Sequence, residues 1–326
     1  MFAFLQAPAW MADHPWLAIG AGLLCLVAGA DLLVRGAVWV ALVLGMSRMA
    51  VGLTLVAMGT SMPELMVSFT AARTGHSEIA MANVIGSNTA NVLLIVGVAA
   101  VICAIHLRVK MLELGYMLVA TALAGLPFLI DGGVTRWLSL CMVLMLVAFC
   151  WQLLRRERRT VRDAHDPGPR ATVGGWLLHV LLIAAGLALL VYGAEWLVDG
   201  AVVLARGWGM SEAVIGMTII AVGTSLPELA TSAIAARKGQ PEIAIGNVVG
   251  SNIFNVGAVL GIAGLLQPFP VDREALGRLM IATVVSALAL VLALRLRNGV
   301  SRACGVIFLL AYAAFLAIEV MLTRGA

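Results

Sequence analysis

Apolar runs long enough to cross a bilayer recur along the whole chain, separated by short polar segments. A membrane helix needs about 20 predominantly apolar residues. The pattern predicts ten helices, at residues 16–44, 48–72, 78–104, 111–131, 134–154, 175–205, 212–236, 242–266, 275–295 and 303–322. The composition agrees with an all-α membrane protein, because 62% of the 326 residues are hydrophobic and only 12% are charged, against about 25% charged in soluble domains.

The second half of the chain repeats the first at an offset of 164 residues. The segment GLTLVAMGTSMPELMVSFTAA at 52–72 aligns with GMTIIAVGTSLPELATSAIAA at 216–236, with 12 identities in 21 positions. Five helices per half is an odd number, so the second half must enter the membrane inverted, as in many secondary transporters. We predict two inverted five-helix repeats at 1–154 and 174–326, joined by a linker at 155–173.

The net charge of +4 does not indicate a nucleic-acid partner, because basic residues of a membrane protein chiefly set its orientation. Most Lys and Arg residues lie at helix ends on the same side as the segment RRERRTVRDAHDPGPR at 155–170. This distribution predicts that the segment is cytoplasmic and that both termini are outside. Binding of anionic lipid or of a regulator is an alternative role for the segment, but a hinge that sets topology is favoured.

The five cysteines are scattered through apolar helices without paired or metal-type spacing, which predicts no disulfide, metal or redox role. They are Cys25, Cys103, Cys141, Cys150 and Cys304.

Two glutamates, Glu64 and Glu228, lie well inside hydrophobic helices at equivalent positions of the two repeats. A carboxylate at such a depth costs roughly 2.5 to 3.5 kcal/mol on insertion scales and by default marks an ion pathway or a functional pair. Neutralisation by a proton or by a nearby arginine is the alternative. It is disfavoured because neither helix carries a basic residue within a turn of its glutamate.

Oxygen atoms suited to a cation surround these two positions in the sequence. Pro63 and Pro227 have no backbone N–H, so we expect carbonyl oxygens at 57–60 and 221–224 to lose helical partners. Polar side chains add hydroxyl and amide oxygens, at Thr60, Ser61, Thr224 and Ser225, and on one helix face each at Ser87 with Asn91 and at Ser251 with Asn255. For Asn83, Asn88, Asn247 and Asn252, helix–helix hydrogen bonding is the preferred interpretation.

An all-oxygen site with two carboxylates suits hard cations. Calcium takes six to eight oxygen ligands, whereas magnesium demands a tight octahedron and keeps its waters. Two negative charges balance one calcium ion or two sodium ions. The residues alone therefore favour calcium and sodium as the ions bound.

The motifs GTSMPE and GTSLPE, followed by GSNTAN and GSNIFN, resemble the two alpha repeats of the sodium/calcium exchanger branch of the cation/calcium exchanger superfamily. The resemblance covers essentially the whole chain. It implies that Glu64 and Glu228 are the central ion ligands. It also implies a surrounding ligand set of Thr60, Ser61, Thr224, Ser225, Ser87, Asn91, Ser251 and Asn255, with the carbonyls of Ala57 and Ala221.

The resemblance further implies that helices 1 and 6 form a long tilted pair that slides across the core as inward-facing and outward-facing conformations alternate. Asp31 and Glu195 belong to this pair, and we interpret both acids as structural, with Asp31 able to pair with Arg35 one turn on.

The expected function is therefore a secondary-active antiporter that exchanges sodium for calcium, with calcium extrusion, and not an enzyme. No prosthetic group is expected; the partners are the lipid bilayer, calcium and sodium, one chain is sufficient for transport, and the oligomeric state stays open. The predicted location is the cytoplasmic (inner) membrane of a prokaryote.

Four alternatives remain: a proton/calcium exchanger, a potassium-dependent exchanger, a cation channel and an intramembrane hydrolase. Within the superfamily that the chain resembles, some archaeal members and the potassium-dependent branch carry Asp where this chain has Asn255, which disfavours potassium coupling. The proton/calcium branch usually has GNxxE in place of GTSxPE, which disfavours proton coupling.

Overall fold

The computed structural model describes residues 13–74, 78–107, 109–130, 133–163, 172–210, 215, 219, 221–296 and 299–324. The elements of the first repeat are α2 (Pro15–Leu44), α3 (Arg48–Val51), η1 (Gly52–Val56), α4 (Ala57–Thr60), α5 (Met62–Arg73), α6 (Glu78–Ala90), η2 (Asn91–Val96), α7 (Gly97–Ile102), β1 (Ile105–His106), α8 (Met111–Leu129) and α9 (Arg136–Asp163).

The second repeat follows the same order. Its elements are α10 (Val173–Gly207), α12 (Ala221–Gly223), α13 (Leu226–Arg237), α14 (Pro241–Phe254), η4 (Asn255–Leu260), α15 (Gly261–Leu266), α16 (Arg273–Leu296), β2 (Gly299–Val300) and α17 (Arg302–Arg324). Segments marked η are π-helical turns inside longer helices.

The described residues confirm an all-helical membrane fold. Eight of their helices are long and apolar enough to span a bilayer, and a ninth candidate is the bent pair from α3 to α5. Of the remaining predicted helix, 212–236, the structure describes residues 215, 219 and 221–236, which include α12 and most of α13. Residues 212–214, 216–218 and 220 lie outside the described residues.

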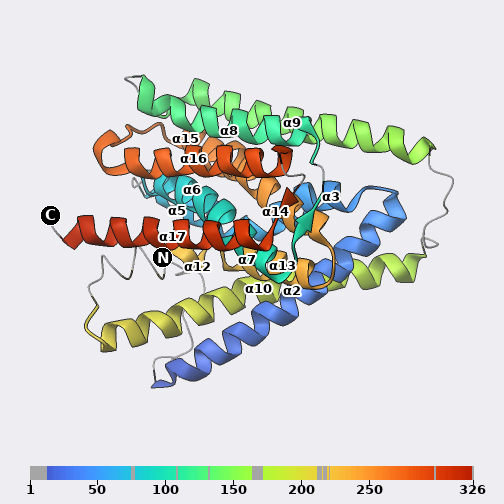
Figure 1. Ribbon diagram of the computed structural model, residues 1–326, viewed down its shortest axis with the longest axis horizontal. Helices are drawn as coiled ribbons and strands as arrows, with labels where there is room; N and C mark the ends of the chain where they lie inside the picture. Colours follow the sequence, from blue (N-terminus) through green and yellow to red (C-terminus); the bar gives the residue numbers. More distant parts are fainter. Residues whose placement is uncertain are drawn as a thin grey trace.

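Helices α2 and α10 cross in close contact along one side of the molecule (Figure 1). Gly22 lies against Gly193 and Gly29 against Gly186, so residue numbers rise along α2 as they fall along α10. The two helices are therefore antiparallel. Because the 164-residue offset makes α10 the counterpart of α2, this packing confirms that the repeats are inverted.

The third helix of each repeat forms the centre of the fold. In the most apolar 18 residues of the spans 79–102 and 241–266, 72% and 83% of the residues are buried inside the protein. The corresponding share is 17–39% in the other single-helix candidate spans. In Figure 1, α6 and α14 lie between α2 and α10 on one side and α8 and α9 on the other. Residues on these two helices are thus shielded from lipid by protein, which allows them to carry polar side chains.

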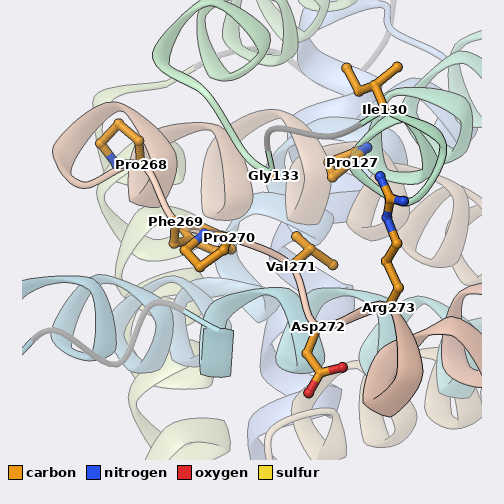
Figure 2. A pocket seen from close by; sticks show the side chains of 9 residues that line it. All are labelled: Pro127, Ile130, Gly133, Pro268, Phe269, Pro270, Val271, Asp272 and Arg273. Carbon is orange, nitrogen blue, oxygen red and sulfur yellow. The ribbon is translucent and has the colours of Figure 1, made fainter.

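Short backbone pairings join loops of the two repeats at two places. Ile105 pairs with Val300 in the antiparallel β1–β2 ladder, and an isolated bridge joins Val134 to Phe269. Beside the second bridge is an open surface pocket of about 700 Å³ (Figure 2). Its lining comes from two segments, Pro127, Ile130 and Gly133 in the first repeat and residues 268–273 in the second. None of the residues predicted to bind ions lines this pocket, so its size does not make it the functional site.

Helix α9 differs from the prediction at its C-terminal end. The fifth helix was expected to end at 154, with a linker from 155, but α9 continues to Asp163. Gln152, Arg155, Arg156 and Glu157 are good helix formers, and they allow the helix to continue beyond its apolar part. Residues 164–171 of the expected linker lie outside the described residues.

Candidate ion-binding site

The break between α4 and α5 positions Glu64. The two helices are bent by 45° at Ser61. Pro63 lies in the first turn of α5, where a missing backbone N–H costs no hydrogen bond. Glu64 then lies in the same first turn, at the helix end whose dipole favours negative charge.

The second repeat builds the same arrangement around Glu228. Ser225 precedes α13, and Pro227 and Glu228 occupy the first turn of that helix. Glu64 and Glu228 are each only 1% exposed. The sequence expectation of two buried intramembrane glutamates beside proline breaks is met in both halves.

Hydrogen bonds between the repeats bring the two glutamates into one cluster. Ser61 Oγ donates to Glu228 Oε1 at 3.0 Å, and Ser225 Oγ donates to Glu64 Oε1 at 3.3 Å. Ser87 Oγ on α6 is 3.5 Å from Glu64 Oε1. Ser61 and Ser225 thus each contact the glutamate of the opposite repeat, whereas Ser87 contacts the glutamate of its own repeat. The two equivalent halves therefore meet at a common centre.

The same cluster contains oxygen atoms that make no hydrogen bond. Among the described residues, ten buried side-chain polar atoms have no partner, and six of these belong to residues predicted to bind ions. The six are Glu64 Oε2, Glu228 Oε2, Asn91 Oδ1, Asn255 Oδ1, Thr224 Oγ1 and Ser251 Oγ. Buried polar atoms are nearly always paired, so this concentration of unpaired oxygens needs an explanation. Hard cations such as calcium and sodium use these oxygen types as ligands.

A second group of polar residues joins helices, as expected. Asn83 Nδ2 donates to the carbonyl of Glu64 at 3.2 Å, and Asn247 Nδ2 donates to the carbonyl of Glu228 at 3.3 Å. Thr60 Oγ1 donates to Asn247 Oδ1 at 3.0 Å. The single hydroxyl proton of Thr60 is therefore used in the hydrogen bond to Asn247, and the lone pairs of its oxygen remain available to a cation.

The backbone near Ala57 differs from the expectation. The carbonyl of Ala57 is not released by the proline, because it accepts the N–H of Ser61 at 3.0 Å. In the second repeat, the N–H of Ser225 donates to the carbonyl of Val222 at 3.1 Å. The missing N–H of Pro63 affects the carbonyl of Gly59, four residues earlier, and that of Pro227 affects Gly223. Ala57 and Ala221 were expected as ligands from the resemblance, and that expectation stays a prediction.

Among the described elements, the π-helical segments η1, η2 and η4 lie next to the cluster, and the sequence analysis did not predict them. η1 immediately precedes Ala57, while η2 and η4 begin at Asn91 and Asn255. A π-helical turn changes the direction of side chains relative to a regular α-helix and is frequent at functional sites. The recurrence of one such turn at Asn91 and at its counterpart Asn255 indicates that the wider turn is part of how these amides are placed.

The charge of the cluster is modest for a metal site. Among the described residues, no three His, Cys, Asp or Glu side chains gather as a metal-chelating group. A cation between Glu64 and Glu228 therefore has two carboxylates and must take its remaining ligands from neutral oxygens. Ligands of this kind favour reversible binding of an ion over permanent retention.

A model of the sodium/calcium exchanger protein family matches residues 14–155 and 178–321 of the chain. The chain belongs to the sodium/calcium exchanger family. The exchanger is 39% identical over 306 residues to the putative antiporter CaxA of Alkalimonas amylolytica, covering 90% of this chain and 95% of that protein. It is 33% identical over 337 residues to the sodium/calcium exchanger MaX1 of Methanosarcina acetivorans, covering 91% and 96%.

Its fold is also similar to a solved structure of the sodium-calcium exchanger NCX_Mj, with a TM-score of 0.78, 29% identity, and coverage of 95% of this chain and 100% of that one. These matches confirm the family inferred from the paired motifs. They also establish the exchanger as an integral membrane cation/calcium antiporter, a transporter and not an enzyme.

Proposed function

We propose that the exchanger moves calcium out of the cytoplasm and that sodium entering down its gradient drives this movement. The six unpaired buried oxygens carry the proposal, because they belong to both halves and combine one oxygen from each of two carboxylates with four neutral oxygens. Two negative charges balance either one calcium ion or two sodium ions, so the same cluster accepts both ions in turn. MaX1 and NCX_Mj, which this chain resembles, are both named as sodium/calcium exchangers.

The proposed ligands are the two glutamates and the oxygen donors around them. Thr224, Ser251, Asn91 and Asn255 contribute oxygens that are otherwise unpaired. Ser61, Ser87 and Ser225 hold the glutamates. Thr60 and the carbonyls of Ala57 and Ala221 complete the proposed set.

A sodium-gradient experiment tests the proposal. Vesicles loaded with sodium and diluted into sodium-free medium should take up labelled calcium, whereas vesicles loaded with choline should not. Uptake driven equally well by an imposed proton gradient, or uptake that requires potassium, would instead support the proton/calcium or potassium-dependent alternative. Flux without any counter-ion would indicate a channel.

The proposed orientation rests on the basic residues of the cytoplasmic side. Arg155 and Arg156, at the end of the apolar part of α9, and the segment that follows them would face the cytoplasm, with both termini outside. We further propose the inner membrane of a prokaryote as the location and two functional units at 1–154 and 174–326. One chain would suffice for transport, because both glutamates belong to the same chain.

The packing of α2 and α10 on the remaining helices supports an alternating mechanism. Helix α2 packs closely against α13, the helix of Glu228. Among the described residues, its counterpart α10 has no comparable packing against α5, the helix of Glu64. The two repeats are similar in sequence. A second conformation, in which α10 packs against α5 and α2 has moved away from α13, is therefore expected, as for other inverted-repeat transporters.

An ion pair joins α2 to the end of α13, and the equivalent positions on α10 and after α5 cannot form one. Asp31 of α2 forms the expected ion pair with Arg35, at 2.6 Å, and also pairs with Lys238 at the end of α13. The offset of 164 residues maps these positions to Glu195 and Thr74, which cannot form an ion pair. The Asp31–Lys238 pair would therefore favour the conformation in which α2 packs on α13.

Lys238→Gln is expected to raise the exchange rate by up to about fivefold, because a partly exposed ion pair contributes at most about 1 kcal/mol and must break in each cycle. The exchange rate of the variant should also depend less on ionic strength than that of the wild type. Arg237→Gln, at the neighbouring exposed position, is the control. Equal behaviour of the two variants would show that the pair does not influence the cycle.

A further inference from the structure

An amide network joins the two repeats next to the proposed ligands. Asn91 Nδ2 donates to Asn252 Oδ1 at 2.9 Å, and Asn255 Nδ2 donates to Asn88 Oδ1 at 3.0 Å. The 164-residue offset maps Asn88 to Asn252 and Asn91 to Asn255, so the two bonds are equivalent. Asn88 Nδ2 also donates to the backbone carbonyl of Asn252 at 3.3 Å.

The orientation of an asparagine amide decides what a cation meets. The amide has an oxygen that accepts and an NH₂ group that donates, and the two ends are nearly equal in size. A cation is attracted by the oxygen and repelled by the NH₂ group. Packing alone therefore does not fix which end of Asn91 or Asn255 faces the glutamates; a hydrogen-bond partner must do so.

Asn252 and Asn88 provide this partner. Each accepts a hydrogen bond from the Nδ2 of an amide in the opposite repeat. That bond fixes the direction of the NH₂ group of Asn91 and of Asn255. Both Oδ1 atoms are buried and have no hydrogen-bond partner in the part of the chain that the structure describes. Asn88 and Asn252 are themselves only 2% and 3% exposed, so water does not readily replace them as acceptors.

We propose that Asn88 and Asn252 are positioning residues for ion binding, each fixing the amide of a ligand from the other repeat with its oxygen toward the cation. The inference rests on the proposed function of the cluster. Because both bonds cross between repeats, each half of the chain sets the ligand geometry of the other half. Asn88 and Asn252 thus act on the ion through Asn255 and Asn91 without binding it.

Asn252→Leu keeps the approximate side-chain size and removes the acceptor. We expect the KM for calcium, measured as sodium-driven uptake, to rise about tenfold, while the maximal rate stays within about twofold. Tenfold corresponds to the loss of one hydrogen-bond partner in a buried site. Thr89→Val is the control, because Thr89 is a buried polar residue next to Asn88, the counterpart of Asn252. Among the described residues, its hydroxyl bonds to Thr283 and to the backbone of Ile85 and not to a proposed ligand, so its calcium KM should not change.

A double-mutant cycle with Asn91→Ala separates positioning from packing. Calcium binding is measured as the calcium concentration that half-saturates the rise in Tm of the purified protein. If Asn252 acts through Asn91, Asn252→Leu should shift this midpoint in the wild type and have almost no further effect in Asn91→Ala. Independent effects that multiply would overturn the inference, as would a lower Tm of Asn252→Leu with an unchanged calcium midpoint.

These outcomes are distinct from failure of the proposed function. If Glu64→Gln exchanged calcium normally, the cluster itself would not be the ion site. If Glu64→Gln were inactive and Asn252→Leu had a normal calcium KM, only the positioning role would be excluded.

Discussion

Glu64→Gln and Glu228→Gln are each expected to reduce sodium-driven calcium uptake by at least about 100-fold. Glutamine has the same size as glutamate, but it removes one of the two negative charges of the cluster. It also places an NH₂ group where a carboxylate oxygen faces the cation. Loss of one partner from a buried charged interaction costs about 3–5 kcal/mol, which corresponds to a factor of 100 or more.

Glu113→Gln is the matched control for this experiment. Glu113 is also a buried glutamate, only 3% exposed, but it lies at the start of α8 near Arg156 and outside the cluster. Its replacement should leave uptake within about threefold of the wild type. If Glu64→Gln or Glu228→Gln retained uptake comparable to that of Glu113→Gln, neither carboxylate would belong to the transport site.

Gly29→Ala is expected to destabilise the protein strongly although it adds one methyl group. A methyl group on Gly29 would lie 2.7 Å from the carbonyl oxygen of Gly186 and 2.9 Å from the backbone nitrogen of Leu190. Backbone atoms cannot move aside as a flexible side chain can, so α2 and α10 would have to separate. Overpacking of this kind costs about 1–3 kcal/mol, and close approach through small residues is what holds membrane helices together.

Gly20→Ala makes the same chemical change on the same helix and serves as the control. No atom of the described residues lies within 4 Å of a methyl group placed on Gly20. Thermal unfolding of the two purified variants should show a clear fall in Tm for Gly29→Ala and little change, or a small rise, for Gly20→Ala. Equal Tm values for the two variants would contradict the close packing of α2 on α10.

The main architecture and the central cluster were predictable because they depend on patterns of single residues and their spacing. The apolar runs give the helices, and the 164-residue offset gives the inverted repeat. The offset also places Glu64 over Glu228 and Asn91 over Asn255. The depth of the two glutamates did not require them to meet; the helix breaks and the cross-repeat bonds of Ser61 and Ser225 bring them together.

Other features depend on geometry that single residues do not specify. The π-helical turns at Asn91 and Asn255 have no distinct residue signature, since the sequences around them are compatible with a regular helix. The pairing of Asp31 with Lys238 joins positions 207 residues apart and arises only from the packing of α2 on α13. The sequence does contain a signal for the α2–α10 contact. Gly22 and Gly29 recur at the repeat offset as Gly186 and Gly193, and such small residues indicate close helix packing.

The most direct test of the central claim is to locate a bound divalent ion in a crystal structure of the purified protein by anomalous scattering from strontium. The account predicts one major peak between the repeats, within ligand distance of Glu64 Oε2 and Glu228 Oε2. A major peak elsewhere would contradict it. One example is the separate pocket of about 130 Å³ that Glu113, Glu157 and Glu242 line.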